Sequence, residues 1–159
     1  MFTFRRKKQR ELYAPVNGCG IALDDVRDEV FSKRLMGDGC TFLPETTSVC
    51  SPIDGDLILV ADTLHAFGVR SREGIELLIH IGLDTVKLQG KGFQALQSVG
   101  TSIKAGTPVI SFDSSYLHDA TLDMTTMLIV TNCANLKIKE ITKGYVLSLI
   151  HISEPTRPY

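Results

Sequence analysis

The chain has 159 residues, of which 43% are hydrophobic and 22% are charged, and its formal net charge at pH 7 is −1. This composition is that of a soluble protein able to bury one core, so we expect a single domain. The near-neutral charge excludes a strongly basic field for a nucleic-acid backbone, and we expect no nucleic-acid partner. The four cysteines form no Cys-x-x-Cys pair and are expected to be reduced.

The N-terminus is basic, with five cations between Arg5 and Arg10. It lacks the apolar stretch of a secretory signal, and no other segment approaches the length of a membrane-spanning helix. We therefore expect a cytoplasmic protein in which residues 1–13 form a solvated basic tail. The alternative is a peripheral anchor at the inner face of the membrane, with Phe2 and Phe4 inserting beside cations that bind anionic headgroups.

Two turns of similar composition begin at Pro15 and Pro52, which lie 37 residues apart. In each turn proline fixes one dihedral angle and a glycine follows three residues later, which is typical of a turn that enters a strand. The same shift aligns further pairs, namely Val16 with Ile53, Gly18 with Gly55, Ile21 with Ile58, Asp25 with Asp62 and Gly37 with Gly74. These matches predict two copies of one β unit.

Short strands are expected after the first turn. Residues 40–44 form a strand that Pro44 ends, and residues 56–61 form an apolar strand whose hairpin partner is residues 64–71. Residues 74–86 form an apolar run with His80 near its middle, long enough for a buried strand and too short to cross a membrane. A histidine in such a strand calls for an explanation.

The second half of the chain continues the pattern of short elements. Between Gly90 and Gly100, apolar Phe93, Leu96 and Val99 recur every three residues, which predicts one or two helical turns with these side chains in the core. The remaining expected elements are a strand over residues 109–112, a short helix over 117–124 and a strand over 127–131. Many short strands separated by glycine and proline indicate an all-β sandwich or barrel with short helical turns.

Of the four histidines, only His65 and His80 lie at or within apolar strands, whereas His118 and His151 lie in polar or terminal segments. Neighbouring strands of a hairpin-rich fold could bring the first two imidazoles together. Such a pair fits either a partial metal site or phosphoryl transfer, in which one imidazole attacks phosphorus and the other donates to the phosphoryl oxygens. Taken alone, each histidine is more simply an ordinary hydrogen-bonded core residue.

Zinc hydrolysis is a further alternative, because two histidines can contribute to a catalytic zinc site. It also needs more ligands and a general base at fixed spacing. The sequence contains no His-x-His or His-Glu-x-x-His motif, which argues against this alternative.

Several ordered motifs carry a resemblance to a known family. They are Val30-Phe31-Ser32, Met36-Gly37-Asp38-Gly39, Pro52-Ile53-Asp54-Gly55, Thr63-Leu64-His65-Ala66-Phe67-Gly68, Glu76-Leu77-Leu78-Ile79-His80-Ile81-Gly82-Leu83-Asp84-Thr85-Val86 and Gly90-Lys91-Gly92-Phe93. Through them residues 24–132, and more loosely the chain from residue 14, resemble the glucose-class enzyme IIA component (EIIA) of the bacterial phosphoenolpyruvate-dependent sugar phosphotransferase system.

The resemblance implies an all-β fold, a compact β-sandwich or flattened barrel built from a duplicated β motif, in agreement with the 37-residue repeat. It also implies a phosphotransferase that works as a phosphocarrier for sugar uptake. The small protein HPr in its phosphohistidine form is the donor to His80, and a cysteine of an EIIB domain of a membrane sugar transporter is the acceptor. No cofactor is required beyond the covalent phosphate on His80.

The resemblance also assigns roles around the phosphorylated histidine. His65 is the second active-site histidine and steadies the phosphoryl group, Thr63 orients His65 through its hydroxyl, and the backbone of Gly82 holds the ring of His80. Asp38 and Asp84 match positions beside the site that meet basic residues of HPr, with the alternative that they are ordinary turn carboxylates.

An apolar face around the histidines is expected to dock the partner proteins. Phe42, Phe67, Leu78 and Val86 are the candidates for it, although each could instead belong to the core. The alternative function is a regulatory binding module that docks onto transporters or metabolic enzymes according to its phosphorylation state. At such an interface His65 and His80 are also candidate zinc ligands, together with ligands from the partner.

The C-terminus departs from the family pattern. Lys143-Gly144-Tyr145-Val146 begins like the family's last turn and strand, but the residues that follow do not continue it. We therefore expect an EIIA-like domain over residues 14–147 and an atypical, foreign or disordered tail over residues 148–159.

Overall fold

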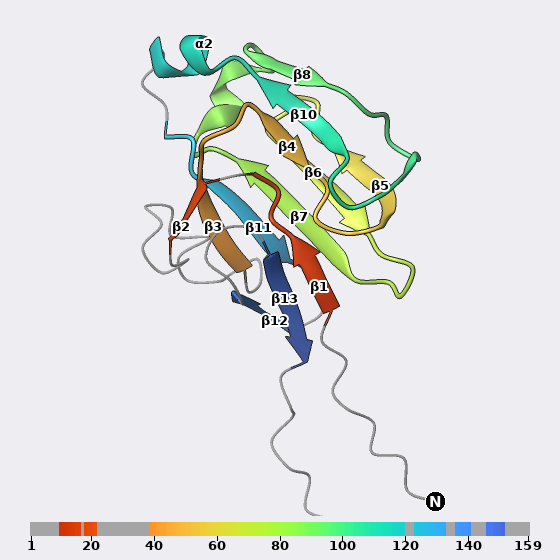
Figure 1. Ribbon diagram of the computed structural model, residues 1–159. Coiled ribbons are helices and arrows are strands. Elements are labelled where there is room, and N and C mark those ends of the chain that lie inside the picture. Colours follow the sequence, from red (N-terminus) through yellow and green to blue (C-terminus); the bar gives the residue numbers. More distant parts are fainter. Residues whose placement is uncertain are drawn as a thin grey trace, which may run out of the picture.

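The structure, a computed structural model, describes residues 10–16, 18–21, 39–119, 123–132, 136–140 and 146–151. Within these ranges the chain consists of short strands, one short α-helix, α2 (Ser114–Asp119), and one 3-10 helix, η2 (Thr85–Leu88) (Figure 1). Every strand pair described is antiparallel. The prediction of an all-β fold with short helical turns is confirmed.

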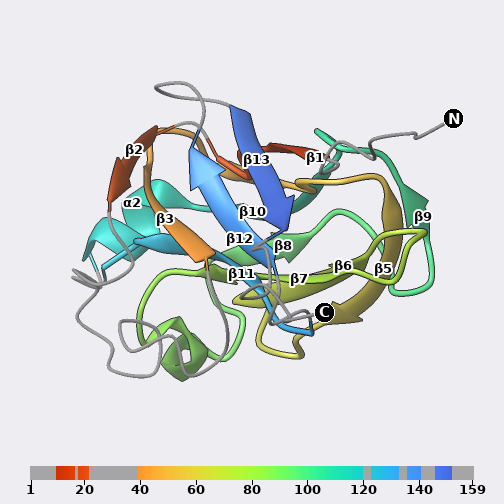
Figure 2. The ribbon, with the colours of Figure 1, turned by 90° about the horizontal axis from the view of Figure 1, so that it is seen from below.

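The described strands form one large and two small sheets. The large sheet has the order β2 (Gly18–Ile21), β3 (Gly39–Pro44), β11 (Thr126–Val130), β7 (Glu76–Ile81), β6 (Ala66–Arg70), β5 (Gly55–Val60), β9 (Ser102–Ile103). One small sheet has the order β4 (Ser48–Cys50), β10 (Pro108–Phe112), β8 (Phe93–Ala95), and the other the order β1 (Arg10–Tyr13), β13 (Val146–His151), β12 (Leu136–Glu140). Figure 2 shows β1, β12 and β13 on one side and β5, β6, β7 and β11 on the other.

The core lies between these layers and is set by the alternation of side chains along β7. Leu77, Ile79 and Ile81 are buried in the main core, while Leu78 and His80 lie on the opposite face of the strand. Their cross-strand partners continue the core: Ile79 pairs with Phe67 of β6 and with Leu128 of β11. Burying one such side chain contributes about 1.5–3 kcal/mol, so the register of β7 is strongly specified.

The same core receives side chains from the two small sheets. Leu12 of β1 and Val109 of β10 are fully buried within it. Burial of these residues against the inner face of the large sheet makes the molecule a sandwich.

Most of the predicted strands are confirmed. The expected strands over residues 40–44, 56–61, 109–112 and 127–131 correspond to β3, β5, β10 and β11. The expected partner of β5 is β6, and the two pair as predicted. The predicted duplication of a β unit stays a prediction.

The predicted helical turns between Gly90 and Gly100 are wrong. The segment contains β8, in which Phe93 pairs with Phe112 of β10, and beyond it the Leu96 N–H donates to the carbonyl of Val109. The Phe93 N–H donates to the Gly90 carbonyl within the segment, but from there to Leu96 the backbone pairs with a distant strand. Leu96 and Val99, expected in the core, are exposed.

A short helix is present as predicted, but it begins at Ser114 rather than at residue 117. Asp113 sets its start, because the Asp113 Oδ1 accepts the N–H groups of Ser115 and Tyr116 at 3.0 and 3.1 Å. This is the geometry of a helix N-cap. Residues 120–122 of the expected helix lie outside the described residues.

The first and last described strands lie side by side, with Arg10 opposite Leu149 and Tyr13 opposite Val146. β1 thus lies within the expected N-terminal tail and ends at its boundary, whereas β13 extends across the expected boundary after residue 147. The domain boundaries themselves stay a prediction. Residues 1–9 and 152–159 of the expected tails lie outside the described residues. None of the helices in the described part of the chain has the length and hydropathy needed to cross a membrane.

Candidate functional site

The structure brings His65 and His80 together at one end of the β6–β7 hairpin. His80 of β7 pairs with Ala66 of β6, and the Ile81 N–H donates to the His65 carbonyl at 2.7 Å. The two ring centroids are 5.0 Å apart and the ring planes meet at 75°, an edge-on arrangement. The convergence expected from a hairpin is thus present, and it results from adjacent positions on paired strands.

His65 is held by the turn that joins β5 to β6. Leu64 has a left-handed backbone with φ 58°, and its N–H donates to the Ala61 carbonyl at 2.8 Å. A left-handed leucine costs about 1–2 kcal/mol, which the surrounding turn must offset. The strained turn places the hydroxyl of Thr63 2.5 Å from the Nδ1 of His65, so that this nitrogen is engaged in a hydrogen bond. Partial burial lowers the pKa of His65, which favours the neutral ring.

His80 is half-buried on the face of β7 opposite the core. Its Nδ1 atom is buried, so the Nε2 is the ring nitrogen through which His80 can meet another molecule. When one imidazole nitrogen is enclosed by protein, only the other can act as a nucleophile toward another molecule.

The turn after β7 is tightly packed behind His80. Gly82 has φ 75°, and a Cβ atom at this position would lie 2.5 Å from the Thr85 Cγ2 and 3.0 Å from the Asp123 carbonyl oxygen. The Leu83 N–H donates to the same Asp123 carbonyl at 2.7 Å. Only glycine fits at this position of the motif. The expected contact of the Gly82 backbone with the His80 ring stays a prediction.

Thr85 is a residue of this turn to which the sequence analysis gave no role. It is fully buried, and its hydroxyl donates to the carbonyl of Ile81 at 2.5 Å. The available signal was a polar residue next to Asp84 in an otherwise apolar run, which needs a hydrogen-bond partner if it is buried.

The predicted docking residues divide by burial. Val86 is 48% exposed, Asp84 is exposed in a left-handed backbone conformation, and Leu78 is half-buried beside Met127 and Ile129. These three predicted positions can therefore meet a partner. Asp38, the other predicted carboxylate, lies outside the described residues.

The prediction that Phe42 and Phe67 belong to the docking face is wrong. Both side chains are buried in the main core, Phe67 completely. Phe67 pairs with Ile79, which fixes its side chain on the core face of the sheet, away from His80.

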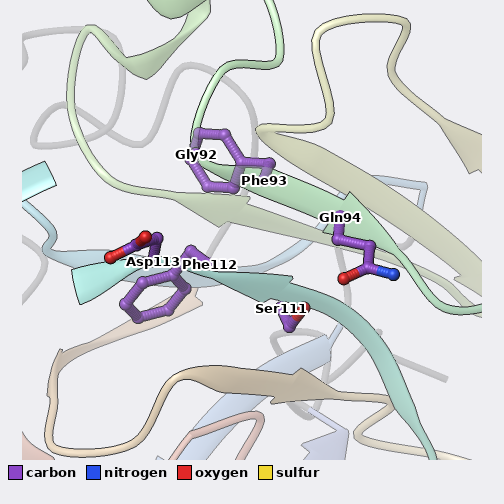
Figure 3. Close-up of a pocket in the computed structure, with 6 residues that line it drawn as sticks. All are labelled: Gly92, Phe93, Gln94, Ser111, Phe112 and Asp113. Carbon is purple, nitrogen blue, oxygen red and sulfur yellow. The ribbon is translucent and has the colours of Figure 1, made fainter. Parts of the chain in front are cut away.

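A surface hollow of about 310 Å³ lies at the β8–β10 strand pair (Figure 3). Its lining consists of Gly92, Phe93, Gln94, Ser111, Phe112 and Asp113. It contains neither imidazole, and its carboxylate, that of Asp113, already caps α2. This hollow is therefore separate from the candidate site.

Metal binding by the described residues is limited to what two imidazoles can offer. Among these residues no three His, Cys, Asp or Glu side chains gather in a way that could hold a metal ion. A zinc ion on His65 and His80 would thus need ligands beyond the described residues, and zinc hydrolysis gains no support from the part of the chain that the structure describes.

These observations define a class of protein: an all-β sandwich with a close imidazole pair on the side of its large sheet that faces away from the core. The family model of the phosphoenolpyruvate-dependent sugar phosphotransferase system, EIIA 1, matches residues 10–136. The chain therefore belongs to this family, as the sequence motifs predicted.

Individual proteins that are similar to the chain agree with the family match. The glucose-specific EIIA component of Staphylococcus epidermidis is 42% identical over 125 residues, which are 79% of this chain and 75% of that protein. The glucoside-specific EIICBA component of Staphylococcus carnosus is 42% identical over 135 residues, which are 85% of this chain. The chain spans only 20% of the length of that larger relative.

A solved structure supports the fold. The glucose permease IIA from Mycoplasma capricolum superposes with a TM-score of 0.83 at 32% sequence identity, covering 94% of this chain and 99% of that one. The similarity extends over nearly the whole of both chains, which confirms the predicted sandwich or flattened barrel.

Proposed function

We propose that the protein is a phosphocarrier that accepts a phosphoryl group on the Nε2 of His80 from phospho-HPr and passes it to a cysteine of an EIIB domain. The observation that supports this most directly is the edge-on pair of His65 and His80, with ring centroids 5.0 Å apart and the Nδ1 of His80 buried. A pair of imidazoles offers one nucleophile and one hydrogen-bond donor, which are the two groups that the reaction needs.

In the first step the lone pair on the Nε2 of neutral His80 attacks phosphorus in line with the donor's P–N bond. That bond breaks and its electron pair returns to the HPr imidazole, while a new P–N bond forms on His80. In the second step the thiolate of the EIIB cysteine attacks phosphorus, a P–S bond forms, and the electron pair of the P–N bond returns to His80. Positioning and charge stabilisation dominate catalysis of such transfers.

His65 serves as the donor to the phosphoryl oxygens. We assign the Thr63 hydroxyl as the donor to the Nδ1 of His65, so that the proton of the neutral ring resides on Nε2. Burial lowers the pKa of His65 and keeps the ring neutral at pH 7, which preserves this tautomer. The Nε2–H can then stabilise charge on the phosphoryl group in both transfer steps.

The partner surface proposed for HPr and EIIB consists of Leu78, Asp84 and Val86 around His80. Val86 and Asp84 are exposed, and they add an apolar contact and a carboxylate that can meet basic residues of HPr. An EIIB acceptor is supported by the names of the Staphylococcus carnosus relatives, in which the A component stands together with C and B components.

The test is incubation of the protein with enzyme I, HPr and phosphoenolpyruvate that carries a radiolabelled phosphoryl group. We expect one acid-labile, base-stable phosphate on the wild type and on His118→Ala, the control variant that removes a histidine outside the pair. His80→Ala should take up none. His65→Ala should accept phosphate but pass it slowly to EIIB. Labelling of His80→Ala at the wild-type rate would refute the assignment.

A further inference from the structure

A series of hydrogen bonds links the backbone of the strand that carries His80, and the backbone of His65, to Thr85. The Ile81 N–H donates to the carbonyl of His65 at 2.7 Å, and the Ile81 carbonyl accepts the hydroxyl of Thr85 at 2.5 Å. Ile81 follows His80 directly in β7. One peptide segment thus carries His80, anchors the backbone of His65 and is itself anchored by Thr85.

Thr85 is shaped for this position in two ways. Its Cγ2 occupies the space beside Gly82 where a side chain would otherwise lie, since a Cβ on Gly82 would be only 2.5 Å away. Its hydroxyl, in a fully buried side chain, bridges four residues back to the end of β7. The methyl and the hydroxyl together fix both the path of the turn and the orientation of the Ile81 carbonyl.

We infer that Thr85 is a positioning residue, which sets the separation of the His65 and His80 rings through its hydrogen bond to the Ile81 carbonyl. Without that bond the end of β7 can rotate, and the Ile81 N–H and the His80 ring would shift relative to His65. The catalytic use of this geometry rests on the proposed phosphoryl transfer. The effect of Thr85 on the distance between the two rings does not depend on phosphoryl transfer, because it concerns the protein without phosphate.

The test compares two substitutions at one site. Thr85→Val keeps the size and the methyl contact with Gly82 but removes the hydroxyl, whereas Thr85→Ser keeps the hydroxyl. Ser51→Ala is the matched control, because Ser51 is also fully buried and its hydroxyl also donates to a carbonyl, that of Ile53, at 2.7 Å. Ser51 lies between β4 and β5, outside the strands that carry the histidines.

The first readout is NMR of the unphosphorylated protein: the nuclear Overhauser effect between the ring protons of His65 and His80, and the pH titration of both rings. We expect Thr85→Val to lose most of the inter-ring effect and to shift the titration of His80, while Thr85→Ser and Ser51→Ala match the wild type. Should Thr85→Val fail to fold, Thr85→Cys, with its weakly donating thiol, replaces it with the same expectation.

The second readout is the rate of phosphoryl transfer from HPr, which we expect to fall about tenfold or more in Thr85→Val at unchanged HPr affinity. Wild-type ring signals in Thr85→Val, equal losses in Thr85→Ser, or an equal loss in Ser51→Ala would each overturn the inference. Failure of the wild type to take phosphate on His80 would instead refute the proposed function, and the ring signals would still decide the role of Thr85.

Discussion

Gly82 is the position at which packing behind His80 leaves the least room. In Gly82→Ala the new methyl would lie 2.5 Å from the Thr85 Cγ2 and 3.0 Å from the Asp123 carbonyl oxygen. Neither neighbour can move freely, since Thr85 is buried and hydrogen-bonded and the other atom belongs to the backbone. Alanine must in addition adopt the φ of 75° found at Gly82.

The expected loss of stability has two parts. The left-handed backbone conformation costs an alanine about 1–2 kcal/mol, and overpacking typically costs about 1–3 kcal/mol more. Gly82→Ala should therefore lower the free energy of unfolding by about 2–5 kcal/mol. Gly74 isolates the backbone part, because it has φ 88° and a methyl group added there would meet no other atom within 4 Å. Gly74→Ala should thus cost only about 1–2 kcal/mol.

Urea unfolding of the wild type and both alanine variants measures the difference, and phosphorylation by HPr measures its effect on the site. We expect Gly82→Ala to be less stable than Gly74→Ala and to accept phosphate more slowly even where it is fully folded. Equal stability of the two variants would refute the steric argument at Gly82. A destabilised Gly82→Ala that accepts phosphate at the wild-type rate would refute the link between this turn and His80.

Three further outcomes test the core, the second histidine and the partner surface. Ile79→Ala should lower the free energy of unfolding by about 2–5 kcal/mol. Leu59 is 46% exposed, so Leu59→Ala should change this free energy by less than about 0.5 kcal/mol. Equal losses in the two variants would contradict the assignment of the core face. Because burial lowers the pKa of His65, the unfolded state binds more protons there, so stability should decline as the pH falls below the ordinary value of 6.5. Urea unfolding across this range should show a shallower decline in His65→Gln, and identical slopes would exclude this role of burial. Asp84→Asn should raise the HPr concentration for half-maximal phosphorylation severalfold at low salt and less at high salt. Val86→Asp should raise this concentration at both salt concentrations. A salt-independent effect of Asp84→Asn would argue against an ionic contact.

The strands and the histidine pair could be predicted because their signals are local. Glycine and proline mark the turns, and a hairpin between residues 56–61 and 64–71 follows from adjacent apolar runs. A strand that begins just after His65 and a neighbouring strand that contains His80 need only pair to bring the rings together, as β6 and β7 do.

The face on which Phe67 points could not be predicted, because β6 shows no contrast between its two faces. Ala66, Phe67, Gly68 and Val69 are all buried, so the polar–apolar alternation that identifies the core side of a strand is absent. The position of Phe67 follows only from its pairing with Ile79, which is a property of the register of two strands.

The helical turns predicted after Gly90 were wrong for a different reason. The spacing of Phe93, Leu96 and Val99 fits a helix, but the partner that makes β8 a strand is β10, which lies further along the chain. Local periodicity carries no information about such a partner.

The strand that carries His80 ties the geometry of the site to the stability of the core. Side chains on a strand alternate, so the register that buries Ile79 and Ile81 is the one that places His80 on the other face, and a slip by one residue would exchange them. The burial free energy of these two isoleucines therefore also holds the nucleophile in place. Asp84 and Val86 lie beyond the last paired residue of β7, where side chains can change without loss of core burial. Substitutions in the strand should thus alter stability and phosphoryl transfer together, whereas substitutions of the exposed Asp84 and Val86 should alter partner binding alone.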